Sequence, residues 1–220
     1  MKPNIKALMI QGGWQGHEPA QTVEIMAAAL RGDGMSVDVV DSLDPLADAE
    51  RLGQYALISI CWTMGEIAKE PLQGLLQAVK GGTGFAGWHG GAGDAFRAKT
   101  EYQFMVGGQW VAHPGGIIDY TVQITDRADP VMAGLDDFAM HSEQYYMHVD
   151  PGNHVLAATE FAGQHAPWIA GTVMPVAWKR HYGDGRVFYC SLGHVAADFT
   201  PPVVTIMRRG MHWAARHGNS

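Results

Sequence analysis

The sequence has little cysteine and no long apolar run, and both shortages narrow the classes of protein to consider. Its 220 residues contain two cysteines, Cys61 and Cys190, too few for the disulfide framework of a small secreted domain. Both stand in apolar segments, so we expect buried free thiols in a reducing compartment. No run of 18 apolar residues and no signal-peptide pattern occurs, which predicts a cytoplasmic protein with no membrane partner.

Charged residues are also scarce, at 17% of the chain, and the formal net charge is -7. A nucleic-acid surface needs a clustered basic face, whereas the densest basic group here is only Lys179, Arg180 and His181. We therefore expect no nucleic-acid partner. Apolar residues make up 47%, which is typical of a folded chain. No internal repeat, low-complexity tract or linker interrupts it, so we predict a single domain over residues 1–220.

Compact cofactor motifs are missing too. The sequence contains no His-x-x-x-His or Cys-x-x-Cys, and neither a P-loop nor G-x-G-x-x-G follows the first predicted strand. We therefore expect no nucleotide cofactor. A divalent metal such as zinc would need ligands that are distant from one another in the sequence.

The first 90 residues alternate between strand and helix patterns. This rhythm predicts a parallel sheet with helices on its faces. The predicted strands are 5–10, 36–40, 55–60 and 83–88, and the predicted helices are 19–30 and 68–80. Further along, the predicted elements are strands at 117–125, 144–149, 154–159, 173–181 and 186–192, and a helix at 203–215. The last two strands flank Gly183-Asp184-Gly185, which is typical of a tight hairpin turn.

Histidine is abundant, with eleven residues, and four of them stand beside glycine or proline at the ends of strand-like segments. These four are His17, His89, His113 and His194. In open parallel sheets, ligands bind at the carboxyl ends of the strands. One such histidine can be an ordinary hydrogen-bonded loop residue, but four of them favour a shared site.

His89 has the most informative surroundings. A strand-like run ends at Trp88, and His89 is followed by Gly90 and Gly91. This is the form of a nucleophile elbow, a tight strand-to-helix turn that exposes one side chain. Histidine at that place suits proton transfer or metal binding. The alternative is a glycine-rich loop that binds an anion at a helix N-terminus.

Glu143 and three tryptophans complete the candidate site. Glu143 precedes Gln144-Tyr145-Tyr146, and a carboxylate beside aromatic rings can act as an acid or base, orient a histidine or bind a metal. The alternative is a surface glutamate. Three tryptophans stand at predicted strand ends, where an indole can stack on a sugar ring or simply fill the core: Trp14, Trp62 and Trp88.

An ordered set of short motifs resembles the trehalose-utilisation (ThuA-like) family and spans nearly the whole chain. The motifs are Gly12-Gly13 with His17; Gly84 to His89; Phe104 to Trp110 with His113-Pro114; Asp129 to Met132 with Gly134-Leu135; Glu143 to Tyr146; Pro175 to Trp178; Tyr182 to Tyr189; Leu192-Gly193-His194; and Trp213-Ala214. The resemblance implies an α/β fold, namely a doubly wound, flavodoxin-like three-layer sandwich with a mostly parallel sheet, as in class I glutamine amidotransferases. It also implies a role in using trehalose or related disaccharides beside a sugar dehydrogenase that makes 3-keto sugars.

Two positions qualify the resemblance. His89 stands where amidotransferase relatives carry the nucleophilic cysteine, so we expect no glutaminase activity. Family members usually carry Asp directly before the glutamate, and here that residue is Ser142. This departure puts in doubt any role that needs two adjacent carboxylates.

These observations lead to three hypotheses. The first is an enzyme that acts on a trehalose-related disaccharide or its 3-keto derivative, with His89 and Glu143 as catalytic residues. In it the substrate is bound by His17, His113, His194, Trp14, Trp62 and Trp88. The second is a sugar-binding or regulatory module without chemistry. The third is a metal-dependent hydrolase with ligands drawn from His17, His89, His113, Glu143 and His194. In each case we expect a homo-oligomer.

Overall fold

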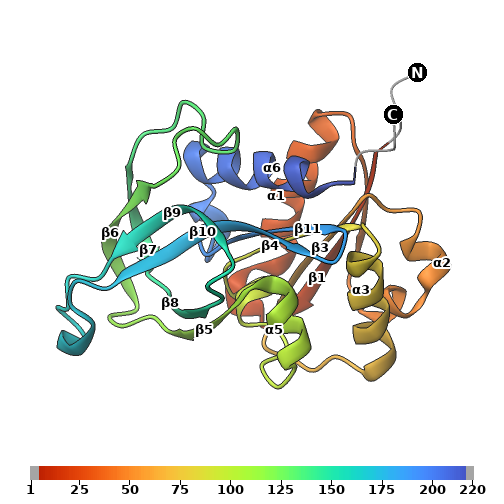
Figure 1. Cartoon of the computed structure of the whole chain (residues 1–220), viewed down its shortest axis with the longest axis horizontal. Helices are drawn as coiled ribbons and strands as arrows, with labels where there is room; N and C mark the ends of the chain where they lie inside the picture. The colour runs from red at the N-terminus through yellow and green to blue at the C-terminus, as the bar shows by residue number, and fades with distance from the viewer. Residues whose placement is uncertain (1–4, 217–220) are drawn as a thin grey trace.

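A nine-stranded sheet separates two hydrophobic cores (Figure 1). The structure is a computed structural model that describes residues 5–216. Within these residues the strand order is β2-β1-β3-β4-β11-β10-β9-β6-β7. Helices cover both faces of its first half, as the α/β prediction requires.

The first five strands in this order are parallel. They are β2 (Ser36–Val40), β1 (Lys6–Gly13), β3 (Leu57–Thr63), β4 (Gly84–Trp88) and β11 (Gly185–Cys190). Successive side chains of a strand point to opposite faces, so Ala7 and Met9 enter one core while Leu8 and Ile10 enter the other. Burial on both faces explains why β1, β3 and β4 read as continuous apolar runs.

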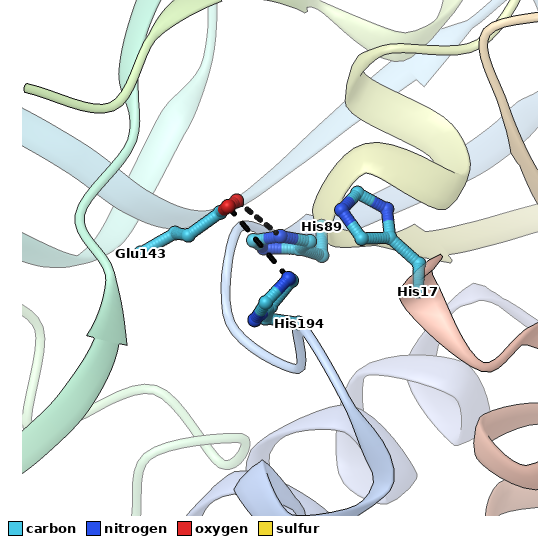
Figure 2. Close-up of side chains that lie close together, drawn as sticks. All are labelled: His17, His89, Glu143 and His194. Atoms are coloured by element: carbon cyan, nitrogen blue, oxygen red, sulfur yellow. Dashed lines mark hydrogen bonds and ion pairs between the residues drawn. The ribbon is translucent and has the colours of Figure 1, made fainter. Parts of the chain in front are cut away.

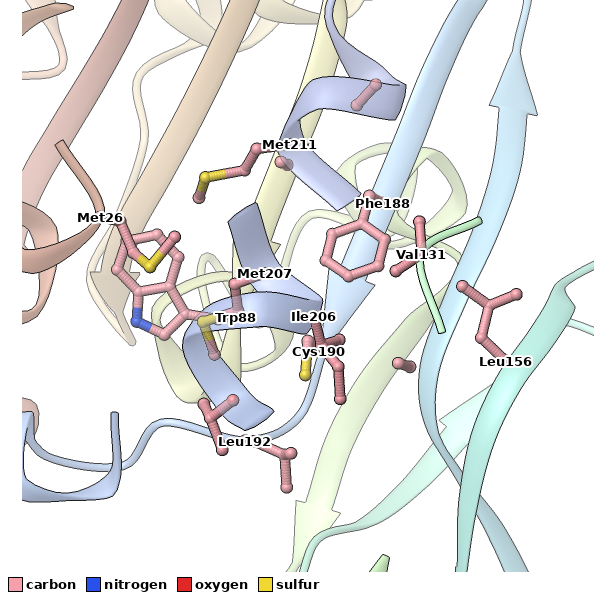
Figure 3. Packing of buried hydrophobic residues seen from close by; sticks show 14 of the residues in the cluster. Met26, Trp88, Val131, Leu156, Phe188, Cys190, Leu192, Ile206, Met207 and Met211 are labelled. Atoms are coloured by element: carbon pink, nitrogen blue, oxygen red, sulfur yellow. The ribbon is translucent and has the colours of Figure 1, made fainter. Parts of the chain in front are cut away.

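The helices divide between the two faces of the sheet (Figure 1). On one face lie α1 (Pro19–Gly32) and α6 (Pro201–Ala214), which contribute Met26, Met207 and Met211 to the core shown in Figure 3. On the other face lie α3 (Lys69–Lys80) and α5 (Thr100–Val106). The short helices are α2 (Ala49–Leu52), α4 (His89–Gly93), η1 (Gln15–His17), η2 (Asp44–Ala47), η3 (Pro167–Ile169) and η4 (Ala196–Asp198).

The other half of the sheet is antiparallel. It consists of β10 (Val173–Tyr182), β9 (His154–Glu160), β6 (Ile117–Ile124) and β7 (Phe138–Glu143). The predicted hairpin joins β10 to β11, and Gly183 adopts a φ of 61° in its turn. A separate two-stranded sheet pairs β5 (Gly108–Ala112) with β8 (Tyr146–Val149).

The structure confirms the predicted fold class and adds elements that the sequence pattern did not reveal. The strand predicted at 144–149 begins only at Tyr146, because Gln144 and Tyr145 form the irregular link between β7 and β8. β7 was missed because its last two buried residues, Ser142 and Glu143, are polar and break the apolar pattern of a strand. The short elements β5 and α5 were also missed, since each carries too few buried residues to show a period.

Both cysteines are buried free thiols, as expected. Burial raises the pKa of each to about 12, so neither forms a reactive thiolate near neutral pH. Among residues 5–216, no helix is both long and apolar enough to cross a bilayer.

A buried ion pair ties the antiparallel half to the segment after β6. Lys179 Nζ lies 2.6 Å from both carboxylate oxygens of Asp129, and both side chains are almost fully buried. We predict that Lys179→Met lowers the free energy of unfolding by about 3–5 kcal/mol, because it leaves a buried carboxylate unpaired. Urea denaturation measures this, and the double variant Lys179→Met/Asp129→Leu should recover much of the loss.

The matched control is the exposed pair of Arg127 and Asp136, whose atoms lie 3.5 Å apart. We expect Asp136→Asn to change the free energy of unfolding by less than about 1 kcal/mol. Equal costs for Lys179→Met and Asp136→Asn would show that burial of the first pair has no special consequence.

Candidate active site

Four side chains from distant parts of the chain converge at one edge of the sheet (Figure 2). His17, His89 and His194 follow β1, β4 and β11, whose carboxyl ends share that edge. Glu143 ends β7 and enters from the antiparallel half. One ligand atom of each residue lies within 4.8 Å of those of the other three.

His89 occupies a strained turn with the geometry predicted for the elbow. It is the first residue of α4 and adopts a φ of 42°, which is uncommon for a residue other than glycine. The glycines beside it allow close packing. A Cβ at Gly91 would lie 2.8 Å from the Cα of Cys61, and one at Gly90 would lie 2.5 Å from Cε1 of His17.

Hydrogen bonds fix the ring of His89 at both nitrogens. Nδ1 lies 2.8 Å from the carbonyl oxygen of Ser191, which can only accept, so Nδ1 carries a proton. Nε2 lies 3.1 Å from Oε2 of Glu143, and the His89 side chain is 1% exposed. The two side chains therefore form a buried, hydrogen-bonded histidine–carboxylate pair.

Glu143 is the only carboxylate of this four-residue cluster. Nε2 of His194 and Nε2 of His113 lie 3.6 Å and 3.7 Å from its Oε1. Burial alone would raise the pKa of Glu143, but the His89 hydrogen bond and the nearby histidine charges together lower it to about 2. The carboxylate is thus ionised at neutral pH.

His17 and His194 have the opposite character. Burial, followed by the charges of His89 and His194, lowers the pKa of His17 to about 3. Burial likewise lowers the pKa of His194. Nδ1 of His17 lies 2.7 Å from Oγ1 of Thr63, and one ring nitrogen of His17 is among the ligand atoms of the cluster. Both rings are neutral at pH 7, so each can accept a proton or bind a metal.

Aromatic rings form one wall of the site. The ring of Tyr145 stacks on His89 with centroids 4.0 Å apart, and the ring of His113 is 6.3 Å from Tyr145. Trp110 lies 5.6 Å from His113, and Arg97 lies over Trp110. Tyr145 and Trp110 were not predicted as site residues, although both lie within the motifs that resemble the family.

Asp198 supplies a second carboxylate beside Ser142. The hydroxyl of Ser142 donates to Oδ2 of Asp198 at 2.5 Å, and the backbone N–H of His194 donates to the same oxygen at 3.1 Å. Asp198 therefore anchors the loop that carries His194. Its contact with Ser142 joins positions 56 residues apart, so no local sequence pattern could reveal it.

The three tryptophans have different positions. Trp14 is 48% exposed, and its ring lies 4.8 Å from His17 at the rim of the site. Trp62 is half-buried against Gly12 and Gly65. The expectation that Trp88 binds substrate is wrong: its side chain is 1% exposed and fills the core in Figure 3. Trp88 ends β4 and packs in the core, whereas His89 begins α4 at the edge of the sheet.

Comparisons with known proteins agree with this fold. The profile of the family described as trehalose utilisation matches residues 6–214. A ThuA-like protein from Parabacteroides merdae has a TM-score of 0.80 and 18% identity, and the match covers 98% of this chain and 92% of that protein. A ThuA-like protein from Bacteroides uniformis has a TM-score of 0.79 and 18% identity, and the match covers 97% of this chain and 92% of that protein.

A cytoplasmic protein from Salmonella typhimurium LT2 is a more distant structural neighbour. It has a TM-score of 0.66 and 15% identity, and the match covers 96% of this chain and 100% of that protein. At such identities these neighbours show the fold alone. A search of curated proteins gave no match. The family profile nevertheless spans nearly the whole chain, and the protein therefore belongs to the trehalose-utilisation (ThuA) family.

Proposed function

We propose that this protein is an enzyme of carbohydrate metabolism that acts on a trehalose-related disaccharide or its 3-keto derivative. The family membership supports the role in carbohydrate metabolism. The buried pair of His89 and Glu143, whose atoms lie 3.1 Å apart, carries the proposal of chemistry. Such a buried polar pair contributes little net stability because both groups lose their hydration. Its place in a cluster of neutral histidines favours a catalytic role.

A 3-keto sugar suits proton transfer because its carbonyl acidifies the adjacent C–H bonds. A base removes the proton at C2, and the electron pair of that bond moves toward the carbonyl to form an enolate. Reprotonation then gives an isomer. Alternatively, the enolate electrons re-form the carbonyl and expel the glycosidic oxygen at C1, which takes a proton from an acid. Hydrolysis of the glycosidic bond by water is a third outcome for the same groups.

The roles follow from the geometry of the site. Glu143 and His89, whose side-chain atoms lie 3.1 Å apart, exchange protons with the substrate and with each other. His17, His113 and His194 position the substrate around this pair, with Trp14 and Trp62 against its rings. On the same family grounds we propose a cytoplasmic homo-oligomer that works beside a sugar dehydrogenase.

We predict that His89→Gln and Glu143→Gln each lower turnover by about 10²–10⁴-fold, because each removes one partner of the proton transfer. Product formation from trehalose and from 3-keto-trehalose is followed by NMR, and circular dichroism checks folding. The matched control is His212→Gln, since His212 is a surface histidine that also contacts a carboxylate, that of Asp33, at 2.7 Å.

Wild-type turnover in His89→Gln would remove His89 from the mechanism. A wild-type protein that binds the sugar in calorimetry, yet forms no product after long incubation, would instead indicate a sugar-binding module.

A second candidate function is a metal-dependent hydrolase, and the donor set of the cluster favours it. Three histidine nitrogens and one carboxylate oxygen within 4.8 Å of one another are ligands that zinc prefers. Nδ1 of His89 is held by the Ser191 carbonyl and Nδ1 of His17 by the Thr63 hydroxyl. Metal-binding histidines usually show such outer contacts, which orient the other nitrogen toward the ion. The residues therefore fit a divalent cation, which would activate water.

We predict that the protein binds one zinc ion and that His194→Ala weakens this binding by at least about 100-fold, since it removes one of four ligands. Competition with a chromophoric chelator measures the affinity, and His212→Ala should retain the wild-type value. Turnover that persists after exhaustive chelation would exclude the metal-dependent hydrolase and leave the metal-free enzyme.

A further inference from the structure

A pocket of about 500 Å³ lies beside the candidate active site, over strand β6. This volume is in the range that small ligands occupy. The side chains of Asp119 and Thr121 on β6 form its floor, and residues 160–166 with Ile169 form a wall. None of the four clustered residues of the active site lines this pocket.

One loop borders both the pocket and the active site. His113 reaches Glu143 at 3.7 Å, and the next residue, Pro114, lines the pocket. The loop is held against the opposite wall, since a Cβ at Gly115 would lie 2.5 Å from the ring of His165. A ligand in the pocket therefore lies next to the His113 loop.

The strand register gives the distance between Glu143 in the active site and the pocket residues on β6 and β7. Glu143 pairs with Ile117 and His141 pairs with Asp119, so these four residues share one face of the β6–β7 ribbon. Glu143 and His141 are two residues apart on β7, which corresponds to about 7 Å. A two-ring molecule with one ring at Glu143 that extends along this face of the ribbon therefore reaches Asp119 and His141.

The pocket also offers the contacts that a sugar ring needs. Nδ1 of His141 lies 2.7 Å from Oδ1 of Asp119, and both side chains are exposed to accept or donate bonds to hydroxyl groups. Gln144 and Thr121 add further polar groups. Ile117 is 45% exposed and provides an apolar surface for the C–H face of a ring.

We propose that this pocket is the subsite for the second ring of a disaccharide whose reacting ring lies at His89 and Glu143. This inference rests on the proposed function and specifies its substrate class. The protein then prefers a two-ring substrate to a single sugar with the same reacting ring, because only the former fills the pocket.

Isothermal titration calorimetry with trehalose and with methyl α-glucoside, a one-ring probe, tests the proposal. We expect the wild type to bind trehalose at least about tenfold more tightly. Thr121→Trp fills the pocket from an exposed position of β6, and should bring the two dissociation constants together without changing that of methyl α-glucoside. Asp119→Ala should weaken trehalose binding alone.

The matched control is Asp136→Ala, an exposed carboxylate outside the pocket lining, which should keep the wild-type preference. Thermal unfolding confirms that each variant folds. An unchanged preference in a folded Thr121→Trp, or equal binding of both sugars by the wild type, overturns the subsite and leaves the proposed function intact. A wild type that neither binds nor converts any sugar overturns both.

Discussion

The contact between His89 and Glu143 joins the two halves of the sheet, and the rest of the site is arranged around it. His89 comes from the turn after the parallel strand β4, and Glu143 from the end of the antiparallel strand β7. The distance of 3.1 Å between them requires the strained φ of 42° at His89 and the close packing of Gly90 against His17. A β-carbon at Gly90 would displace His17, which is itself a member of the cluster.

The same contact determines the electrostatics. One ionised carboxylate faces several imidazoles in a largely buried space, and His89 is the ring that hydrogen-bonds it at 3.1 Å. Burial keeps His17 and His194 neutral. Neutral imidazoles beside a carboxylate can accept protons or hold a divalent cation. Both candidate functions therefore use one arrangement, and they differ in whether a proton or a metal ion lies between His89 and Glu143.

The sequence predicted the parallel half of this site better than the antiparallel half. His17, His89 and His194 were identifiable because each follows a continuous apolar strand, and the carboxyl ends of parallel strands meet at one edge. Glu143 was identified from its family motif, while the strand that carries it was missed. Trp88 was placed wrongly because proximity to a strand end does not reveal which face a side chain occupies. Contacts between distant loops, such as that of Ser142 with Asp198, have no local signature.

That last contact gives the hydroxyl of Ser142 a defined role in this protein. The Asp198 carboxylate accepts from the Ser142 hydroxyl and from the backbone N–H of His194. An aspartate at position 142 would place a second negative charge against Asp198 and repel this loop. The loop has another anchor, since the N–H of Ala196 donates to Glu18, the residue after His17. Ser142 and Asp198 thus form a compatible pair that holds His194 in reach of Glu143.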